Sequence, residues 1–273
     1  MSKQAAVSHY IHGTDPEEQE RLGLLNDMLN RKCLVELAAR LGDRVLDVGS
    51  GLGQFTHAIA EAVGSQGHVV GIERSPEQLA QARAIAPALA EFREGDAYHL
   101  PLRDEEWGSF DVIHARFLLE HLQDPLAAAR QMARAARPGG RIVLEDDDHP
   151  ILKLEPEPPG FPALWTAYQR AYDRLGNDPL SGRRLVSILH EAGARPSRAT
   201  LISWSNCTGH EEFPVLVRNL IEVIRTSRAQ VIRFNLLTGE AFDAALEEIA
   251  RWSQRPDAAF WYAVSWAEGI IPL

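Results

Sequence analysis

The sequence predicts an α/β protein with a doubly wound, mostly parallel sheet of seven strands, helices on both faces of the sheet, and a helical lid or insertion. Short apolar runs alternate with helix-patterned segments between residues 44 and 149. This alternation is typical of parallel sheets, because parallel neighbours need a long crossover that is usually a helix. A glycine-rich turn between the first apolar run and its helix is the second indication.

The expected elements follow from apolar periodicity and from the residues that interrupt it. Residues 22–41 place leucines at helical spacing ahead of the first strand, and Gly139 and Gly140 end one helix and turn the chain into the next strand. The expected strands cover residues 44–49, 68–73, 91–95, 110–115, 141–145, 199–204 and 259–266. The expected helices cover residues 55–63, 76–86, 125–136, 162–175, 179–192, 211–225 and 239–252.

We divide the chain into three regions. Residues 1–43 form an N-terminal helical cap, residues 44–149 the core with the glycine turn, and residues 150–273 the rest of the α/β fold with helical lid or acceptor-binding insertions. The proline-rich stretch 150–162 is expected to cross the surface as an extended connector. Aromatic residues recur at helical spacing after it, which fits either a lid helix over the site or ordinary core packing: Trp165, Tyr168 and Tyr172.

Charge and composition exclude several classes of protein. The chain has 28 basic and 38 acidic residues, a net charge of −10, so no long-range field attracts nucleic acid. Two cysteines are too few for a disulfide scaffold. The N-terminus lacks a secretory signal and no apolar stretch is long enough to span a membrane, so we expect a cytoplasmic protein. It would be a monomer or a homodimer.

The most informative motif is the turn Asp47-Val48-Gly49-Ser50-Gly51-Leu52-Gly53. It lies directly between a strand and a helix, where the backbone must approach a ligand without an intervening Cβ. The dinucleotide fingerprint G-x-G-x-x-G would need Gly or Ala at position 54, which is Gln54. The turn therefore predicts a nucleotide-type ligand but disfavours a nicotinamide oxidoreductase.

This turn resembles the first motif of the class I S-adenosylmethionine-dependent methyltransferases, an acidic residue, one spacer and then G-x-G-x-G. Three later stretches resemble the same family in order and spacing: Glu73 at the end of the second strand, Gly95-Asp96-Ala97 followed by Leu100-Pro101, and Phe110 to Leu122 before Asp124-Pro125. The resemblance is closest to small-molecule methyltransferases of ubiquinone and menaquinone biosynthesis. It implies a Rossmann-like fold and transfer of a methyl group to an oxygen, nitrogen or carbon of a small acceptor.

The resemblance also implies roles for individual residues. Asp47 would orient the turn and the amino group of the cofactor, Glu73 would accept from two ribose hydroxyls, and Asp96 would accept from the adenine amino group. Tyr10, in a polar segment with His12 and Gly13, would fold over the methionine end or belong to a disordered tail. The full set implied for S-adenosylmethionine, whose product is S-adenosylhomocysteine, is Tyr10, Asp47, Gly49, Ser50, Gly51, Gly53, Phe55, Glu73, Arg74, Gln78, Asp96, Ala97, His114, Ala115 and Arg116.

Three histidines are candidates for a general base: His121, His114 and His149. An imidazole can take a proton from an acceptor hydroxyl near neutral pH. His121 follows the fourth strand, at the sheet edge where open α/β folds bind ligands, although it could equally pack and hydrogen-bond at a helix start. We expect that at least one of the three is required for activity.

The acidic stretch Glu145 to His149 follows the fifth strand and has the composition of a cation site. Consecutive residues of an extended chain point to alternate sides, so at most two or three could face one ion. We therefore expect no metal here and a polar strand exit that lines the acceptor pocket. The alternative functions are a non-catalytic S-adenosylmethionine-binding protein and, less favoured, an RNA methyltransferase or a nicotinamide oxidoreductase.

Overall fold

The computed structural model describes residues 29–85 and 90–273. They belong to two compact units, which we describe separately. The sheet unit contains the described residues up to Ile151, together with Asp178–Trp204 and Tyr262–Leu273. The helical unit contains Leu152–Asn177 and Ser205–Trp261. Among the described residues, no helix combines the length and apolar composition that a membrane crossing requires.

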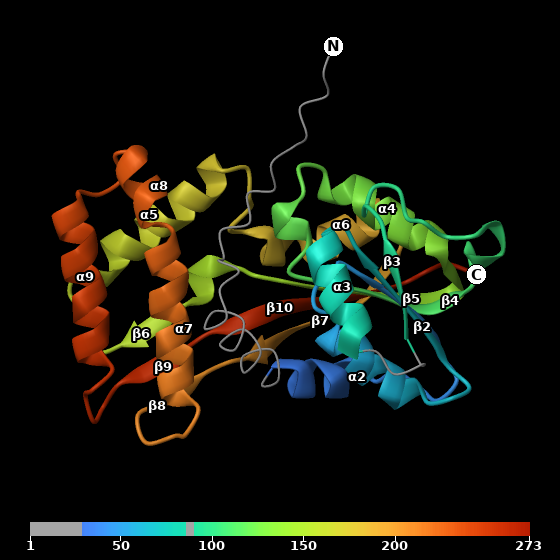
Figure 1. Cartoon of the computed structure of the whole chain (residues 1–273), viewed down its shortest axis with the longest axis horizontal. Coiled ribbons are helices and arrows are strands. Elements are labelled where there is room, and N and C mark those ends of the chain that lie inside the picture. Colours follow the sequence, from blue (N-terminus) through green and yellow to red (C-terminus); the bar gives the residue numbers. More distant parts are fainter. Residues whose placement is uncertain (1–28, 86–89) are drawn as a thin grey trace, which may run out of the picture. The chain divides into compact units, whose positions relative to one another are not determined.

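A seven-stranded sheet forms the centre of the sheet unit (Figure 1). Its order is β3 (Ala90–Glu94), β2 (His68–Glu73), β1 (Arg44–Val48), β4 (Phe110–Arg116), β5 (Ala136–Asp146), β10 (Ala263–Ile270) and β7 (Arg195–Ser203). The pairs from β3 to β5 are parallel, and β10 is antiparallel to both of its neighbours. The expected seven-stranded, mostly parallel sheet is confirmed.

The strand order reverses between β1 and β4, since the chain first extends the sheet through β2 and β3 and then returns to the other side of β1. In open α/β sheets, ligands bind outside the carboxyl ends of the strands at such a switch point. The glycine turn that follows β1 lies at this point.

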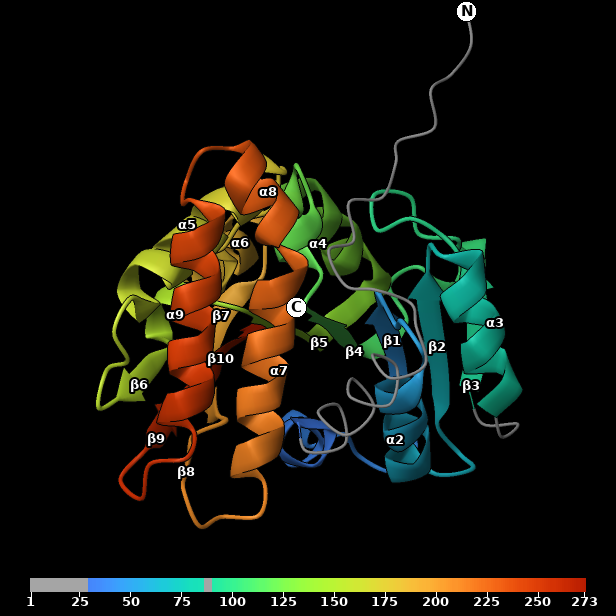
Figure 2. The ribbon, with the colours of Figure 1, turned by 60° about the vertical axis from the view of Figure 1, so that its left-hand side comes forward.

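Helices cover both faces of the sheet, as alternation along the strands dictates. On one face, Leu46 and Ile113 join a core with α4 (Pro125–Ala135) and α6 (Leu185–Glu191). On the other face, the adjacent Val45 and Val112 pack with α2 (Gln54–Val63) and with the helical residues 29–37. Helix α3 (Pro76–Ile85) lies alongside β2 and β3 (Figure 2).

The remaining helical turns of the sheet unit are short and lie in its connections. They are η1 (Asp104–Glu106), η2 (Leu119–His121), η3 (His149–Ile151) and η4 (Ser181–Arg184). Helix α4 begins where Asp124 accepts a hydrogen bond from the Ala127 amide and Pro125 occupies the first turn.

The helical unit contains α5 (Phe161–Arg174), α7 (Phe213–Thr226), α8 (Arg228–Arg233) and α9 (Gly239–Trp252). A small antiparallel sheet has the order β6 (Lys153–Glu155), β9 (Ala259–Trp261) and β8 (Asn206–Cys207). Trp165 and Tyr168 of α5 stack with ring centroids 4.9 Å apart and rings within 4° of parallel. Both are buried, so the aromatic repeat predicted for this helix lies on its packed side.

Several expected boundaries are wrong. The last expected strand is two strands, because β9 pairs in the small sheet and β10 in the large one. The helix expected from residue 179 begins as the 3₁₀ turn η4, where a Cβ on Gly182 would lie 2.6 Å from Ser265 Oγ. Strand β5 begins at Ala136 instead of residue 141 and has an irregular register against β4. The expected connector at 150–162 contains β6, and α8, β6 and β8 were not expected.

Candidate active site

The glycine turn closes the carboxyl end of β1 and starts α2. Gly49, Gly51 and Gly53 all have positive φ, at 79°, 54° and 79°, a region that side chains with a Cβ rarely occupy. The amides of Gly49 and Ser50 both donate to the carbonyl of Ile72, at 2.8 and 2.9 Å. The turn is therefore fixed to the end of β2.

The three glycines differ in what surrounds them. A Cβ on Gly53 would lie 2.8 Å from both Ala82 and Phe92, and one on Gly49 would lie 3.1 Å from Leu118. A Cβ on Gly51 would meet only the Gln78 amide oxygen, at 3.7 Å. Gly53 and Gly49 are required by packing, whereas the side of Gly51 is open and leaves its backbone accessible to a ligand.

Glu73 ends β2 beside this turn. Its two carboxylate oxygens accept from the amides of Gly51, at 3.0 Å, and Ser75, at 2.7 Å. This brings together Gly51, Glu73 and Gln78, while Arg74 is exposed beside them. Asp96, which follows β3, accepts from the Tyr98 amide at 2.8 Å, and the next residue, Ala97, is buried.

Some residues of the implied set face the interior. Ala115 has no exposed surface, and the Ser50 side chain packs towards Gly71 of β2, where an added Cβ would lie 3.0 Å from it. Of these two, Ser50 could meet a ligand only through its backbone, and Ala115 is enclosed by the protein. Tyr10, His12 and Gly13 lie outside the described residues.

Asp47 lies below the turn and is 3% exposed. Its carboxylate accepts from the Thr56 hydroxyl at 2.5 Å and from His114 Nδ1 at 2.7 Å. Burial would raise the pKa of Asp47, but the hydrogen bonds and charge of His114 hold it below its usual range. Both of its oxygens have partners inside the protein, which support the turn, and its role toward the amino group of the cofactor stays a prediction.

His114 of β4 lies between two buried carboxylates. Its Nδ1 faces Asp47, and its Nε2 lies 2.8 Å from Glu145 Oε1. Burial alone would lower the pKa of His114, but the hydrogen bonds and charges of Asp47 and Glu145 raise it to about 9. Both ring nitrogens are occupied, so the geometry argues against His114 as a general base.

The hydrogen bonds continue to Cys33, in the helical residues 29–37. The Cys33 thiol donates to Glu145 Oε2 at 2.9 Å. Burial and the neighbouring Glu145 carboxylate raise the pKa of this thiol well above its ordinary value. A continuous buried chain thus joins Thr56, Asp47, His114, Glu145 and Cys33.

Arg116 ends β4 above this chain. Its guanidinium lies 4.5 Å from the centre of the Phe55 ring, and its Nη2 donates to Asn30 at 2.7 Å. Its Nη1 is inaccessible to solvent and has no hydrogen-bond partner among the described residues. A buried guanidinium nitrogen without an acceptor is costly, which makes it a candidate for binding an anionic group.

The other two histidines differ in accessibility. His121 is partly exposed, at 28% of its side chain, and its Nε2 lies 3.5 Å from Glu120. His149 is buried, and burial together with the nearby His121 lowers its pKa to about 3. Both follow strands at the carboxyl edge of the sheet.

The acidic stretch Glu145 to His149 spans the end of β5, and its first two residues have partners on different elements, Cys33 for Glu145 and Ser181 for Asp146. Glu145 and Asp146 are fully buried, and Asp148 pairs with Arg183 at 2.7 Å. Burial and the adjacent Asp147 raise the pKa of Asp146 to about 8. Ligand-type atoms of Glu120, Asp147 and His149 lie within 4.8 Å of one another.

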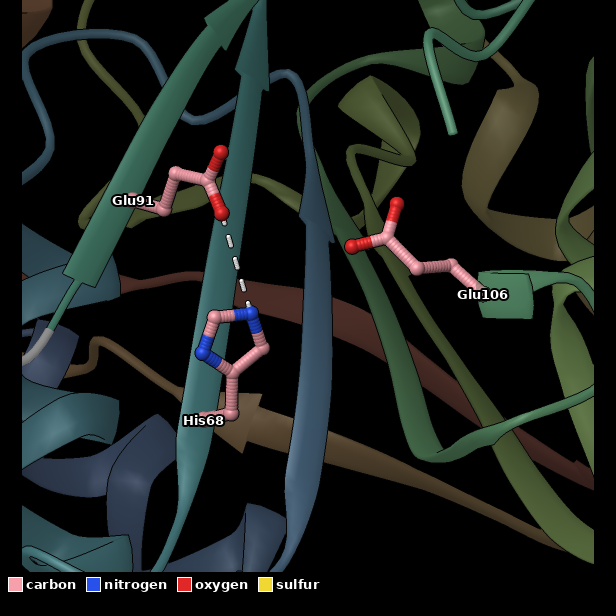
Figure 3. Close-up of side chains that lie close together, drawn as sticks. All are labelled: His68, Glu91 and Glu106. Atoms are coloured by element: carbon pink, nitrogen blue, oxygen red, sulfur yellow. Dashed lines mark ion pairs between the residues drawn. The ribbon is translucent and has the colours of Figure 1, made fainter. Parts of the chain in front are cut away.

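A second cluster with metal-type ligands is His68, Glu91 and Glu106, of which the first two lie on the neighbouring strands β2 and β3 (Figure 3). The Arg93 guanidinium contacts both carboxylates of this cluster, at 2.8 Å from Glu91 and 2.6 Å from Glu106. Arg103 also pairs with both carboxylates, at 3.2 and 3.6 Å, so two arginines balance two carboxylates and this cluster is an ion-pair network.

Sequence reasoning missed Thr56, Cys33 and Arg183. The missed signal for the buried chain is a polar residue set in or directly after an apolar run of a strand, since Asp47 and His114 each interrupt such a run and Glu145 ends one. A buried polar group needs a partner, and three such groups in neighbouring strands can satisfy one another.

Known methyltransferases are similar to this chain in sequence and in fold. A family model described as a methyltransferase domain matches residues 40–193. An O-methyltransferase of Penicillium expansum is 33% identical over 67% of this chain and 64% of its own length. A demethylmenaquinone methyltransferase of Staphylococcus aureus is 28% identical over 56% of this chain and 67% of its own length.

An uncharacterized 37.1 kDa protein of a Streptomyces fradiae transposon is 35% identical, and the chain spans 45% of it. The chain thus spans between about half and two thirds of the curated relatives that it matches. A structure titled as a putative methyltransferase of Bacillus halodurans shares the fold, with a TM-score of 0.59 at 18% identity over 90% of this chain and all of the other. The family model covers more than half of this chain, which therefore belongs to the methyltransferase domain family.

Proposed function

We propose that the protein transfers a methyl group from S-adenosylmethionine to a small-molecule acceptor by in-line displacement. The observation that carries this proposal is the open glycine turn with its Gly51 amide bound to Glu73 at the carboxyl edge of the sheet. Relatives named as an O-methyltransferase and a demethylmenaquinone methyltransferase support a small acceptor. The net charge of −10 argues against RNA.

The adenosine half would lie along the ends of β1, β2 and β3. Glu73 would accept from the ribose hydroxyls and remain bonded to Gly51, since each carboxylate oxygen has two lone pairs. Asp96 would accept from the adenine amino group, with Arg74, Gln78 and Ala97 beside it. These roles are assigned by the family resemblance and supported by the positions of Glu73 and Gln78.

The methionine half would lie near the end of β4, where Arg116 would bind its carboxylate through the buried Nη1. An arginine in contact with Phe55 is preorganised, because the ring restricts the guanidinium plane. This assignment gives the unsatisfied nitrogen a partner.

When bound, the sulfonium supplies an electrophilic methyl group, so the chain mainly needs to align an acceptor and exclude water. Of the three histidines, we assign the general base to His121. His114 is bonded at both nitrogens, and His149 is a weak base because of its burial. Once an acceptor is known, His121→Gln should lower kcat by about 10² or more, and unchanged kcat in all three single variants would overturn a histidine base.

Calorimetric titration with S-adenosylmethionine and S-adenosylhomocysteine tests the cofactor. We expect single-site binding in the micromolar range, about −8 kcal/mol at 1 μM, and none of NADH or NADPH. Glu73→Gln should weaken binding at least tenfold. The matched control is Glu94→Gln, because Glu94 pairs in register with Glu73 on β3 and is exposed.

Binding of the nicotinamides, or of none of the four, would contradict the proposal. Methylated product from candidate acceptors then distinguishes an enzyme from a protein that only binds the cofactor.

A further inference from the structure

The buried chain through His114 crosses three adjacent strands. It runs from Thr56 to Asp47 at 2.5 Å, to His114 at 2.7 Å, to Glu145 at 2.8 Å and to Cys33 at 2.9 Å. All five residues are at most 3% exposed. It joins β1, β4 and β5 to α2 and to the helical residues 29–37.

With Asp47 and Glu145 both ionised, the hydrogen-bond geometry requires a proton on each ring nitrogen of His114. A carboxylate only accepts hydrogen bonds, and each ring nitrogen faces a carboxylate oxygen. A neutral imidazole has one N–H and could satisfy only one of the two carboxylates. With both nitrogens protonated, the two bonds are complete and the charge lies between two buried anions.

The elements around His114 add little further charge. Strand β1 contributes Asp47, β5 contributes Glu145, and β4 contributes Arg116, whose charge also acts on Asp47. The helical residues 29–37 contribute the Cys33 thiol, and α2 contributes the Phe55 ring, 4.8 Å from the imidazole, and Thr56. The charges of Asp47 and Glu145 are balanced by those of Arg116 and His114 only while His114 is protonated.

The bonds of His114 lead to both halves of the proposed cofactor site. Asp47 is two residues before Gly49, and its other partner, Thr56, lies in the first turn of α2. Arg116 is two residues beyond His114 on the same strand and rests on Phe55. A change at His114 would therefore move the glycine turn relative to the arginine.

We propose that His114 is a cationic positioning residue that holds the glycine turn of β1 in register with Arg116 of β4, so that the affinity for S-adenosylmethionine depends on its protonation. This inference rests on the proposed function. It assigns His114 no contact with the acceptor and no proton transfer.

The first test does not involve the cofactor. In the full chain labelled with ¹⁵N and ¹³C, the ring signals of His114, assigned with His114→Gln, should show both nitrogens protonated at pH 7. A single neutral tautomer at pH 7 would overturn the proposal.

The second test measures the affinity for S-adenosylhomocysteine by calorimetry. His114→Gln, which can donate to only one carboxylate, should weaken binding at least tenfold. His57→Gln is the matched control, because His57 is also buried in this unit but contacts no carboxylate among the described residues: its Nε2 lies 3.3 Å from the Ala82 carbonyl and its ring packs against Phe92. Circular dichroism and a cooperative melt confirm that each variant is folded, and an unchanged affinity in folded His114→Gln would refute the positioning role.

The pH profile separates positioning from mere structural support. Relative to His114→Gln, the affinity of the wild type should fall by an additional factor of ten or more between pH 8 and pH 10, and His57→Gln should follow the wild type. Titration of the ligand's own amine is common to all three proteins and cancels. Parallel pH profiles for all three proteins would overturn the proposal. Absence of binding by the wild type would instead contradict the proposed function, and the ring signals of His114 would still show whether it is protonated.

Discussion

His114 and Asp47 are register partners on the neighbouring strands β4 and β1, and the imidazole Nδ1 lies 2.7 Å from the carboxylate Oδ1. A buried carboxylate in the middle of an α/β sheet is unfavourable unless it is paired. The pair with His114 stabilises this buried carboxylate and links β1, which leads into the glycine turn, to β4, which carries Arg116. Fold stability and cofactor affinity thus depend on the same imidazole.

The stability of the fold should fall as pH rises from 6.5 to 9. The pKa of His114 is raised from 6.5 to about 9 in the folded state, so protonation stabilises the fold fully below pH 6.5. This stabilisation, at most about 3 kcal/mol, is lost as pH rises through 9. Urea unfolding of the wild type and His114→Gln at pH 6.5, 8 and 9 measures the difference.

In that series, His57→Gln should keep the pH dependence of the wild type. The free energies of unfolding of the wild type and His114→Gln should converge near pH 9. If their difference stays constant from pH 6.5 to 9, His114 is neutral in the folded protein.

The sequence was sufficient for β1, β2 and β4, because local signals determine them. The apolar runs of β1, β2 and β4 and the glycines after β1 are contiguous in the chain, and their expected positions agree with the structure. The contacts of His114 with Asp47 and Glu145 span 67 and 31 residues. Only the strand order and register bring these residues together, so the sequence alone could offer His114 no more than candidate roles, as a base or beside the cofactor.

The end of the chain shows the same limit. A continuous apolar pattern over residues 259–266 predicts one strand, but it does not show that the chain leaves one sheet at Trp261 and enters another at Ala263. Pairing partners, which are distant in sequence, decide where a strand divides. The antiparallel direction of β10 is invisible to periodicity for the same reason.

Alanine substitutions in the glycine turn should separate packing from ligand access. In Gly53→Ala, the positive φ should lower the free energy of unfolding by about 1–2 kcal/mol. The added Cβ would also lie 2.8 Å from Ala82 and Phe92, and this overpacking should cost about 1–3 kcal/mol more. Gly51→Ala has only the backbone cost but places a methyl group on the open side of the turn. Thermal melts and calorimetry with S-adenosylhomocysteine should therefore show a large loss of stability in Gly53→Ala and a mainly reduced affinity in Gly51→Ala.

Gly108→Ala is the control for the backbone cost, since Gly108 has φ of 69° and no atom within 4 Å of an added Cβ. Its loss of stability should equal that of Gly51→Ala, with unchanged affinity. Equal affinities of Gly51→Ala and Gly108→Ala for S-adenosylhomocysteine would place the ligand elsewhere.

Replacement of Arg116 should weaken cofactor binding without a comparable loss of fold. Arg116→Lys keeps the charge but removes the planar fork that can bind a carboxylate while Nη2 donates to Asn30. We expect the dissociation constant for S-adenosylmethionine to rise about tenfold, which corresponds to about 1.4 kcal/mol. Arg134→Lys is the control, because Arg134 also lies over an aromatic ring, that of Trp107. If both variants lose the same affinity for S-adenosylmethionine, Arg116 has no specific role in binding it.

Arg93 of β3 should stabilise the sheet through its ion pairs. Arg93 forms ion pairs with Glu91 and with the buried Glu106. The pKa of Glu106 is lowered to about 2, chiefly by its hydrogen bonds with Arg93. Arg93→Gln would leave the buried Glu106 carboxylate with only the more exposed Arg103, 3.6 Å away, and should cost about 3 kcal/mol. Chemical denaturation at pH 7 should show this loss, with unchanged affinity for S-adenosylhomocysteine in the folded fraction.

The acid dependence of stability identifies the cause of that loss. Because the folded-state pKa of Glu106 is depressed, its contribution is present above about pH 4.5 and is lost as pH falls towards 2. The wild type should therefore lose stability over this window, and Arg93→Gln should lose less. Arg103 is the more exposed and more distant partner of Glu106, at 3.6 Å. Arg103→Gln should therefore retain most of the pH dependence of stability seen in the wild type. If Arg93→Gln and the wild type lose stability equally between pH 4.5 and 2, the Arg93 ion pair does not depress the Glu106 pKa.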